Sequence, residues 1–233
     1  MSHRPRKRFG QNFLHDPAVI GRIVAAINPS SSDKLVEIGP GQGAITQHLV
    51  DACGAMDVIE LDRDLVAPLT RACAGLGELR VHGADAQAFD FCRLAAPGAP
   101  LRLVGNLPYN VSTPLLFHLL EQARCVLDMH FLLQKEVVAR ITAAPGGKAW
   151  GRLGVMLALS FESEFLLEVG PGEVHDGEVV QQGPPPAGRE AGKEGHFRAP
   201  PRGDLPDGPF GEAIRQGQAI FENTNAHKVS AKY

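Results

Sequence analysis

The sequence lacks any apolar run long enough to cross a lipid bilayer. Its longest apolar stretches, 126–133 and 155–159, are interrupted by charge or fall far short of the roughly 20 residues that a membrane helix needs. The first residues, M-S-H-R-P-R-K-R-F-G-Q-N-F-L, are basic, but no apolar segment of a secretory signal follows them. We therefore expect a cytoplasmic protein without membrane association.

The cysteines lack the spacing of a metal site or a redox motif. The chain contains four, no C-x-x-C pair is present, and no histidine lies close enough in sequence to suggest a metal site. We expect no bound metal. We also expect reduced, mostly buried thiols at Cys53, Cys73, Cys92 and Cys125.

Charge is distributed unevenly along the chain. The net charge is −3, yet residues 1–160 hold 16 Lys and Arg against 14 Asp and Glu, whereas residues 161–233 hold 7 against 12. The basic residues are densest near the start, at Arg4, Arg6, Lys7 and Arg8. Such an arm is either a solvated tail or a segment that contacts phosphates, and charge alone does not decide between the two.

Alternating strand and helix patterns begin at about residue 35. With 233 residues, of which 44% are hydrophobic, the chain can bury one sizeable core. Strands are predicted at 35–38, 56–61, 79–82, 101–104 and 129–134, and helices at 17–27, 44–51, 64–73, 113–122 and 135–142. This order predicts an α/β fold with a mostly parallel sheet covered by helices on both faces. Ligands of such sheets bind at the carboxyl ends of the strands.

The composition changes after about residue 168. Gly, Pro and charged residues dominate from there on, and hydrophobic periodicity disappears. Such a segment buries too little apolar surface to offset the entropy lost on ordering. We expect residues 170–210 to be largely disordered or loosely attached, with only 212–222 capable of forming a helix.

A glycine-rich loop and a carboxylate follow two consecutive predicted strands. The stretch V-E-I-G-P-G-Q-G has the spacing G-x-G-x-G, which differs from the G-x-G-x-x-G dinucleotide fingerprint. Its glycines allow close approach of a ligand to the backbone, although a purely structural turn would also use them. Glu60 follows the next strand, 21 residues after Gly39. A carboxylate there is either a solvated charge or, together with the loop, a ligand of a ribose.

Two further strand ends carry polar residues. Asp85, in G-A-D-A, is either a turn residue or an acceptor for an exocyclic amine such as the N6 of adenine. In V-G-N-L-P-Y-N, Pro108 restricts Leu107 to extended conformations, which would hold backbone carbonyls toward a cleft. Asn106 adds a side-chain acceptor, and Tyr109 offers a flat face for stacking. A plain strand-turn-helix connection leaves these last two residues unexplained.

An acceptor-rich pocket of this kind suits methyl transfer to an amine. An exocyclic amine on a purine is a poor nucleophile because its lone pair is delocalised into the ring. Acceptors that bind its two hydrogens free the lone pair to attack an electrophilic methyl group. Orientation then supplies most of the acceleration, provided that the base is held out of its stack.

Six motifs, in this order, resemble those of the S-adenosylmethionine-dependent rRNA adenine N6-dimethyltransferases. They are R-F-G-Q-N-F-L, V-E-I-G-P-G-Q-G, I-E-L-D, G-A-D-A, G-N-L-P-Y-N-V-S-T-P-L-L-F and L-L-Q-K-E-V-V-A-R-I. The match covers roughly residues 6–168 and is most similar to the small-subunit branch, which dimethylates two adjacent adenosines near the 3′ end of that RNA. The resemblance implies a Rossmann-like class I methyltransferase fold and S-adenosylmethionine as cofactor. It also implies small-subunit rRNA in an assembling ribosomal subunit as partner.

The resemblance implies roles for individual residues. The implied cofactor ligands are Asn12, Leu14, Gly39, Gly41, Glu60, Asp85, Ala86 and Asn106. The implied residues at the target amine are Asn106, Leu107 and Pro108, with Tyr109 stacked on the target base. The implied RNA contacts are Arg4, Arg6, Lys7 and Arg8. Phe131 and the segment 134–136 either line the same cavity or serve core packing.

The resemblance divides the chain into three parts. Residues 1–16 form a basic segment that contacts cofactor and RNA, residues 17–169 form the catalytic domain, and residues 170–233 replace the family's small, basic, helical RNA-binding domain. The last part is acidic and rich in Gly and Pro, and we expect a degenerate or disordered C-terminal domain. We hypothesise that it is out of frame or otherwise diverged, and a basic helical domain encoded in another reading frame would support this.

Three other functions are compatible with parts of the pattern. A large-subunit rRNA adenine N6-methyltransferase shares most of the motifs, although such enzymes usually carry Ile before the Pro of N-L-P-Y. A ribosome-assembly or RNA-binding factor with little turnover would keep the fold. An NAD-linked oxidoreductase would use the glycine loop and Glu60 but leave N-L-P-Y and Q-N-F-L without a role. We expect a monomer, because no apolar interface stripe is evident.

Overall fold

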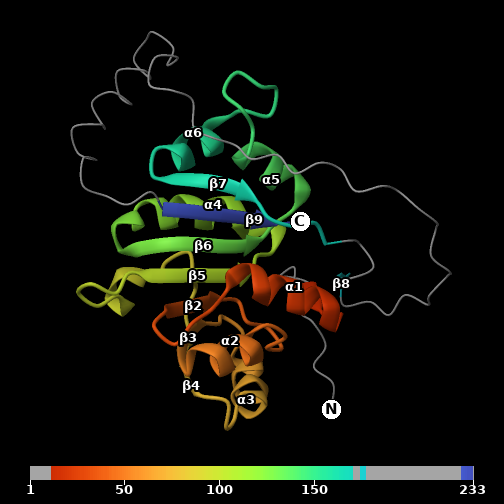
Figure 1. Cartoon of the computed structure of the whole chain (residues 1–233), viewed down its shortest axis with the longest axis vertical. Coiled ribbons are helices and arrows are strands. Elements are labelled where there is room, and N and C mark those ends of the chain that lie inside the picture. The colour runs from red at the N-terminus through yellow and green to blue at the C-terminus, as the bar shows by residue number, and fades with distance from the viewer. Residues whose placement is uncertain (1–11, 170–173, 177–226, 233) are drawn as a thin grey trace, which may run out of the picture.

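The computed structural model describes residues 12–169, 174–176 and 227–232. Within them, one parallel sheet has the strand order β4-β3-β2-β5-β6-β9-β7 (Figure 1). Its strands are β2 (Lys34–Ile38), β3 (Ala55–Ile59), β4 (Glu78–His82), β5 (Leu101–Asn106), β6 (Val126–Leu132), β7 (Phe161–Phe165) and β9 (His227–Lys232). The chain runs outward from β2 to β3 and β4, then returns to place β5 on the other side of β2. This reversal opens a crevice at the carboxyl ends of β2 and β5.

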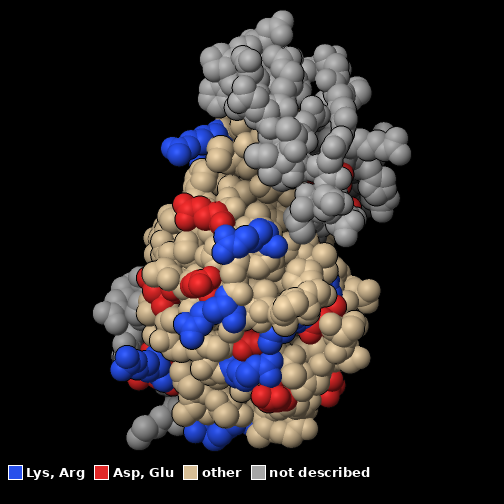
Figure 2. All heavy atoms as spheres, turned by 90° about the vertical axis from the view of Figure 1, so that its left-hand side faces the viewer, with Lys and Arg blue, Asp and Glu red and all other residues tan. Residues whose placement is uncertain are grey.

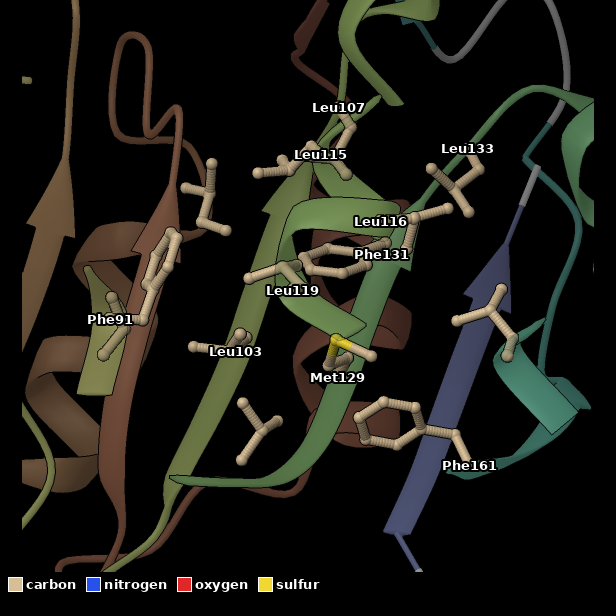
Figure 3. Close-up of a cluster of buried hydrophobic side chains, with 14 of the residues drawn as sticks. Phe91, Leu103, Leu107, Leu115, Leu116, Leu119, Met129, Phe131, Leu133 and Phe161 are labelled. Carbon is tan, nitrogen blue, oxygen red and sulfur yellow. The ribbon is translucent and has the colours of Figure 1, made fainter. Parts of the chain in front are cut away.

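Helices cover both faces of the sheet, as the alternating pattern predicts. One face packs against α1 (Pro17–Ile27), α2 (Thr46–Cys53) and α3 (Arg63–Ala72). The other packs against α4 (Tyr109–Leu120), α5 (Lys135–Ile141) and α6 (Arg152–Ala158). Figure 3 shows the second layer, where Leu116 and Leu119 of α4 lie over Leu103 and Phe131 of the sheet. Burying a side chain of this size contributes about 1.5–3 kcal/mol, so these layers hold the strand ends in place.

The predicted strands and most of the predicted helices are confirmed to within a few residues. The exception is the helix predicted at 113–122, because α4 begins at Tyr109, directly after Pro108. Ser112 or Thr113 would be a suitable cap for a helix that starts at 113. In the structure Ser112 is buried inside the helix, and its hydroxyl donates to the Pro108 carbonyl at 2.7 Å. Tyr109 and Asn110 therefore lie on a helix, not in a loop.

Two segments of the predicted tail belong to the fold. Strand β8 (Val174–Asp176) pairs antiparallel with β1 (Asn12–Leu14), and β9 lies between β6 and β7, parallel to both. Strand β9 is hard to foresee, because H-K-V-S-A-K alternates polar and apolar residues but contains only two apolar ones, Val229 and the small Ala231. Backbone groups of both neighbours pair with it, which stabilises a strand without a strong side-chain pattern. The rest of the predicted disordered segment and the predicted helix at 212–222 lie outside the described residues.

One expectation about the cysteines is wrong. Cys92 and Cys125 are joined by a disulfide, with their Cα atoms 5.4 Å apart. Cys92 lies in η2 (Phe91–Leu94) and Cys125 in η3 (Ala123–Cys125), two short 3-10 helices that precede β5 and β6. A sequence separation of 33 gives no sign that they meet. Cys53 and Cys73 are free and buried, as expected.

No helix within the described part of the chain is both long and apolar enough to span a bilayer.

Candidate functional site

A cavity of about 180 Å³ opens at the carboxyl ends of β2, β3, β4 and β5. It lies in the crevice that the strand order creates. Most of the residues predicted for a ligand site line it: Leu14, Gly39, Gly41, Glu60, Asp85, Ala86, Asn106, Leu107 and Pro108. The structure thus brings the separate strand-end motifs to one place.

The glycine loop after β2 forms one wall of the cavity. Gly39, Gly41 and Gly43 have φ values of 67°, 58° and 85°, a region that favours glycine. A Cβ on Gly43 would lie 2.7 Å from the Leu69 side chain, whereas a Cβ on Gly39 would meet nothing within 4 Å. A side chain on Gly43 would have to displace the Leu69 side chain of α3 as well as adopt the left-handed backbone, while Gly39 leaves space on the loop where a ligand can approach.

Glu60 is buried and holds the glycine loop from the neighbouring strand end. Its Oε2 accepts from the Gly41 N–H at 3.2 Å, and its Oε1 accepts from the Asp62 N–H at 2.7 Å. Burial raises the pKa of this carboxyl. The solvated strand-end charge that we considered as an alternative is wrong, because Glu60 is only 5% exposed. Asp62 caps α3 by accepting from the Asp64 N–H.

Asp85 lies at the opposite rim, after β4. One carboxylate oxygen accepts from the Gln87 N–H at 2.9 Å, so the residue does close a turn, as the structural alternative had it. The side chain is nevertheless exposed and lines the cavity together with Ala86. The turn and the ligand role are compatible, because a carboxylate has a second oxygen to offer.

The N-L-P-Y segment forms the wall across from Glu60. Asn106 ends β5, and the Leu107 N–H donates to the Leu132 carbonyl at 3.1 Å, which fixes the segment to β6. Tyr109 does not line the cavity; its side chain is 63% exposed at the start of α4. Its position at the rim suits stacking on a base that arrives from solvent.

The N-terminal segment reaches the cavity through Leu14. Leu14 is buried and lines it, and the backbone of β1 is held by pairing with β8. The Asn12 side chain, like the basic arm at Arg4, Arg6, Lys7 and Arg8, lies outside what the structure describes. Strand β8, which lies in the tail that we placed past the catalytic domain, thus holds this segment at the cavity.

Phe131 and the segment 134–136 do not line the cavity. Phe131 is fully buried in the core against α4, and Gln134 to Glu136 are exposed. Core packing is therefore the correct interpretation of Phe131.

Several lining residues received no predicted role. Asn110 and Val111 line the cavity because α4 begins earlier than predicted. Glu37 also lines it and is only 1% exposed. Burial raises the pKa of Glu37 to about 8; the Thr46 hydroxyl opposes this shift and the charge of Glu60 adds to it. Its place two residues before the first glycine was the only signal in the sequence.

The electrostatics of the cavity favour a cationic ligand. Among the described residues that line it, four are acidic (Glu37, Glu60, Asp62 and Asp85) and none is Lys or Arg. The pyrophosphate of a dinucleotide would meet no basic side chain there, whereas a sulfonium or ammonium group would be attracted. Glycine loop, ribose-type carboxylate and acidic lining together fit S-adenosylmethionine better than NAD.

At the amino ends of the strands, on the side away from the cavity, several basic side chains form ion pairs with acidic ones. Figure 2 looks onto the side at the amino ends of the strands, where blue and red side chains are interspersed. Arg102 pairs there with Asp33 and Asp128, and Arg80 pairs with Asp57 and Glu78. The described residues on this side therefore form no continuous row of positive charge to which an RNA backbone would bind.

This combination of sheet order and site chemistry defines the class of Rossmann-like methyltransferases. The fold is similar to that of a dimethyladenosine transferase from Plasmodium falciparum, with a TM-score of 0.55 and 28% identity over 63% of this chain and 52% of that one. It is also similar to the 23S rRNA methyltransferase ErmE, with a TM-score of 0.54 and 27% identity over 63% of this chain and 57% of that one.

The family follows from the sequence match. The model of the family "Ribosomal RNA adenine dimethylase" matches residues 2–205, so the chain belongs to that family. This match extends beyond residue 168, where we expected the resemblance to end. Two relatives, both named ribosomal RNA small subunit methyltransferase A, are from Methylococcus capsulatus and Pseudomonas putida. The Methylococcus capsulatus protein is 58% identical over 73% of this chain and 66% of its own length. The Pseudomonas putida protein is 54% identical over 73% of this chain and 63% of its own length. The chain thus spans just under two thirds of the length of these curated relatives.

Proposed function

We propose that the chain transfers methyl groups from S-adenosylmethionine to N6 of two adjacent adenosines near the 3′ end of small-subunit rRNA. One observation carries this proposal. The cavity that contains Gly39 and Glu60 also contains Asn106, Leu107 and Pro108, so a cofactor wall and an acceptor wall face the same space. An enzyme that binds a dinucleotide would not need the acceptor wall.

The cofactor wall binds and orients. Glu60 would accept from the ribose hydroxyls while it keeps the Gly41 amide in place. Asp85 and Ala86 would hold the adenine, and Leu14 and Asn12 would cover the methionine end. The bound cofactor supplies an electrophilic methyl group on a sulfonium. The protein needs no metal for this chemistry, since orientation contributes most of the acceleration.

The acceptor wall would prepare the target amine. The Asn106 side chain and the backbone carbonyls next to Pro108 can accept the two N6 hydrogens, which localises the lone pair on nitrogen. The hydrogen bond from the Leu107 N–H to the Leu132 carbonyl of β6 holds this wall rigid. Tyr109, exposed at the rim, would stack on the base after it leaves the RNA helix. The proton lost after transfer can pass to solvent through the open side of the cavity.

The comparison of relatives favours the small-subunit substrate over the large-subunit one. Identity is 58% with the Methylococcus capsulatus protein named for the small subunit, against 27% with ErmE, which is named for 23S rRNA. The proposed partner is therefore small-subunit rRNA in an assembling subunit. We also propose that the chain acts in the cytoplasm as a monomer.

The fold allows a second candidate function. The cofactor wall is held by buried Glu60, whereas Tyr109 at the rim is 63% exposed, so a chain of this fold can bind the cofactor with little transfer to RNA and act as an assembly or RNA-binding factor. The basic arm at residues 4–8 would be its main RNA contact. Turnover on real subunits separates the two candidates.

The test is methyl transfer to small subunits purified from cells that lack this modification. The purified chain is incubated with tritiated S-adenosylmethionine, and the modified nucleotides are mapped. We expect label on two adjacent adenosines near the 3′ end of the RNA and none on large subunits. Cofactor binding without transfer to either subunit would favour the assembly factor, and label on large subunits alone would favour the large-subunit enzyme.

A further inference from the structure

Glu37 is the most completely buried carboxyl among the described residues that line the cavity. It lies on β2, in register with Val58 of β3 and Val104 of β5, and is 1% exposed. The Thr46 hydroxyl at the start of α2 lies beside this carboxyl, but neither that hydroxyl nor Glu37 Oε2 makes a well-formed hydrogen bond within the described residues. Burying an ionised carboxyl with so little hydrogen bonding is costly, which favours its neutral form.

The titratable groups around Glu37 are acidic or neutral. Glu60 approaches from the end of β3 and Cys73 from the end of α3. Burial, and after it the charge of Glu37, raises the pKa of the Cys73 thiol. His130 follows on β6, two strands away on the same face, because Glu37 is paired with Val104 and Val104 with His130. Helices α1 and α2 bury only uncharged residues against the sheet.

Arg102, a basic residue on this face of the sheet, pairs with acidic residues away from the cavity. Arg102 of β5 donates to Asp128 and Asp33 near the amino edge of the sheet, at the opposite end of the strands from the cavity. No Lys or Arg is among the described residues that line the cavity. An ionised Glu37 would therefore face Glu60 without a cation to balance either charge.

A proton on Glu37 removes this imbalance while the cavity is empty. Burial is the main reason that the pKa of Glu37 rises to about 8, and repulsion by Glu60 adds to the shift. At neutral pH Glu37 in the empty site would thus be a neutral carboxylic acid beside Glu60. A cationic ligand reverses the balance, because its charge favours the ionised form of a carboxyl close by.

We propose that Glu37 carries a proton in the empty protein and releases it to solvent when a cationic cofactor enters, so that cofactor binding is coupled to deprotonation. The O–H bond of the carboxylic acid breaks, the proton goes to buffer, and the carboxylate remains as a counter-charge to the ligand. This inference rests on the proposed function for the identity of the cation, S-adenosylmethionine. In this proposal the carboxylate of Glu37 balances the positive charge of the ligand, so neutral fragments of the cofactor gain nothing from it.

The experiment is calorimetric titration of the whole chain with S-adenosylmethionine in phosphate and in imidazole, which both buffer near neutral pH and differ in ionisation enthalpy. The difference in observed heat gives the number of protons released. Measurements at pH 6 to 7 stay below the pKa of the ligand's own amino group, about 7.7–8.0 for an α-amine. In that range we expect close to one proton released and an affinity that rises about tenfold per pH unit.

Matched ligands and variants identify the group. S-adenosylhomocysteine, which keeps the ammonium, should also release a proton, whereas neutral 5′-methylthioadenosine should release none. Glu37→Gln should bind with no proton release and with affinity independent of pH. Glu121→Gln, the same change at an exposed position on the C-terminal end of α4, should behave like the unmodified chain.

The outcomes separate this inference from the proposed function. Binding of S-adenosylmethionine without proton release, or release that persists in Glu37→Gln, would overturn the inference and leave the proposed function standing. Absence of binding would overturn both. If Glu37→Gln does not fold, carbon-13 NMR of labelled glutamate in the unmodified chain decides. A Glu37 carboxyl signal in the protonated position at pH 7 that moves to the ionised position on adding sinefungin supports the inference, and an ionised signal in the empty protein overturns it.

Discussion

The two walls of the cavity differ in how completely the chain builds them. On the β2 and β3 side, Glu60 is buried, holds two backbone amides and fixes the glycine loop. On the β5 and α4 side, the backbone is anchored at Leu107 but Tyr109 is 63% exposed. The first wall is preorganised for a small ligand, and the second is open toward a large one. Cofactor binding should therefore depend on the chain alone, whereas catalysis should depend on how RNA reaches Tyr109.

The largest expected effect comes from the acceptor wall. Asn106→Ala removes the side-chain acceptor for the target amine, and losing one preorganised polar group of this kind lowers kcat by roughly 10²–10³-fold. Single-turnover assays on unmethylated small subunits measure this loss. Because Asn106 also lines the cofactor cavity, S-adenosylmethionine affinity is measured in parallel. A drop in affinity as large as the drop in rate would assign Asn106 to the cofactor wall alone.

Glu60→Ala should weaken cofactor binding most among the changes on the first wall. The change removes a charged acceptor from the ribose and also frees the Gly41 amide, and hydrogen bonds to charged groups are worth about 1.5–3 kcal/mol. We expect Kd for S-adenosylmethionine to rise roughly 10–100-fold. Titration calorimetry measures it, with circular dichroism as the check on folding. Unchanged affinity in a folded variant would remove Glu60 from the cofactor site.

Tyr109→Ala should separate the two walls most cleanly. Stacking on a base is worth about 1–3 kcal/mol, so the KM for small subunits should rise about tenfold or more, while cofactor affinity stays unchanged. The side chain is exposed, so the free energy of unfolding should change by no more than about 0.5 kcal/mol. Tyr109→Phe keeps the ring and should restore the KM. Failure of Phe to restore it would mean that the hydroxyl, not the ring, is used.

The smallest expected effect is at the adenine rim. Asp85 is exposed and already accepts from the Gln87 amide, so Asp85→Ala should weaken cofactor binding only about five- to tenfold, in line with about 1 kcal/mol for one solvent-accessible hydrogen bond. Equilibrium titration beside Glu60→Ala gives the comparison directly. A larger loss for Asp85→Ala than for Glu60→Ala would reverse the ranking of the two carboxylates.

Local patterns predicted the arrangement of the β2 and β3 side of the cavity better than that of the β5 and α4 side. Gly39, Glu60 and Asp85 each follow a predicted strand, and parallel strands place their carboxyl ends at one edge, so strand order alone brings these residues together. The start of α4 was missed because Ser112 looks like a cap, whereas its hydroxyl bonds back to Pro108 inside the helix. Propensity cannot distinguish these two uses of a serine.

Long-range pairings were not predictable from the sequence. The contact of Cys92 with Cys125 depends on how η2 and η3 pack before β5 and β6. The role of β8 in holding β1 depends on where the chain returns after β7. The burial of Glu37 depends on its two neighbouring strands and on α2. These features arise from the assembled sheet, so no single window of sequence contains them.

Cofactor binding in the absence of RNA tests the central claim most directly, because that claim is a preformed S-adenosylmethionine wall within this chain. Titration calorimetry of the purified chain with S-adenosylmethionine, and separately with NAD, is the measurement. The preformed wall predicts one molecule of S-adenosylmethionine bound per chain and no measurable heat with NAD. Binding of NAD in preference, or no binding of S-adenosylmethionine by folded protein, would contradict it.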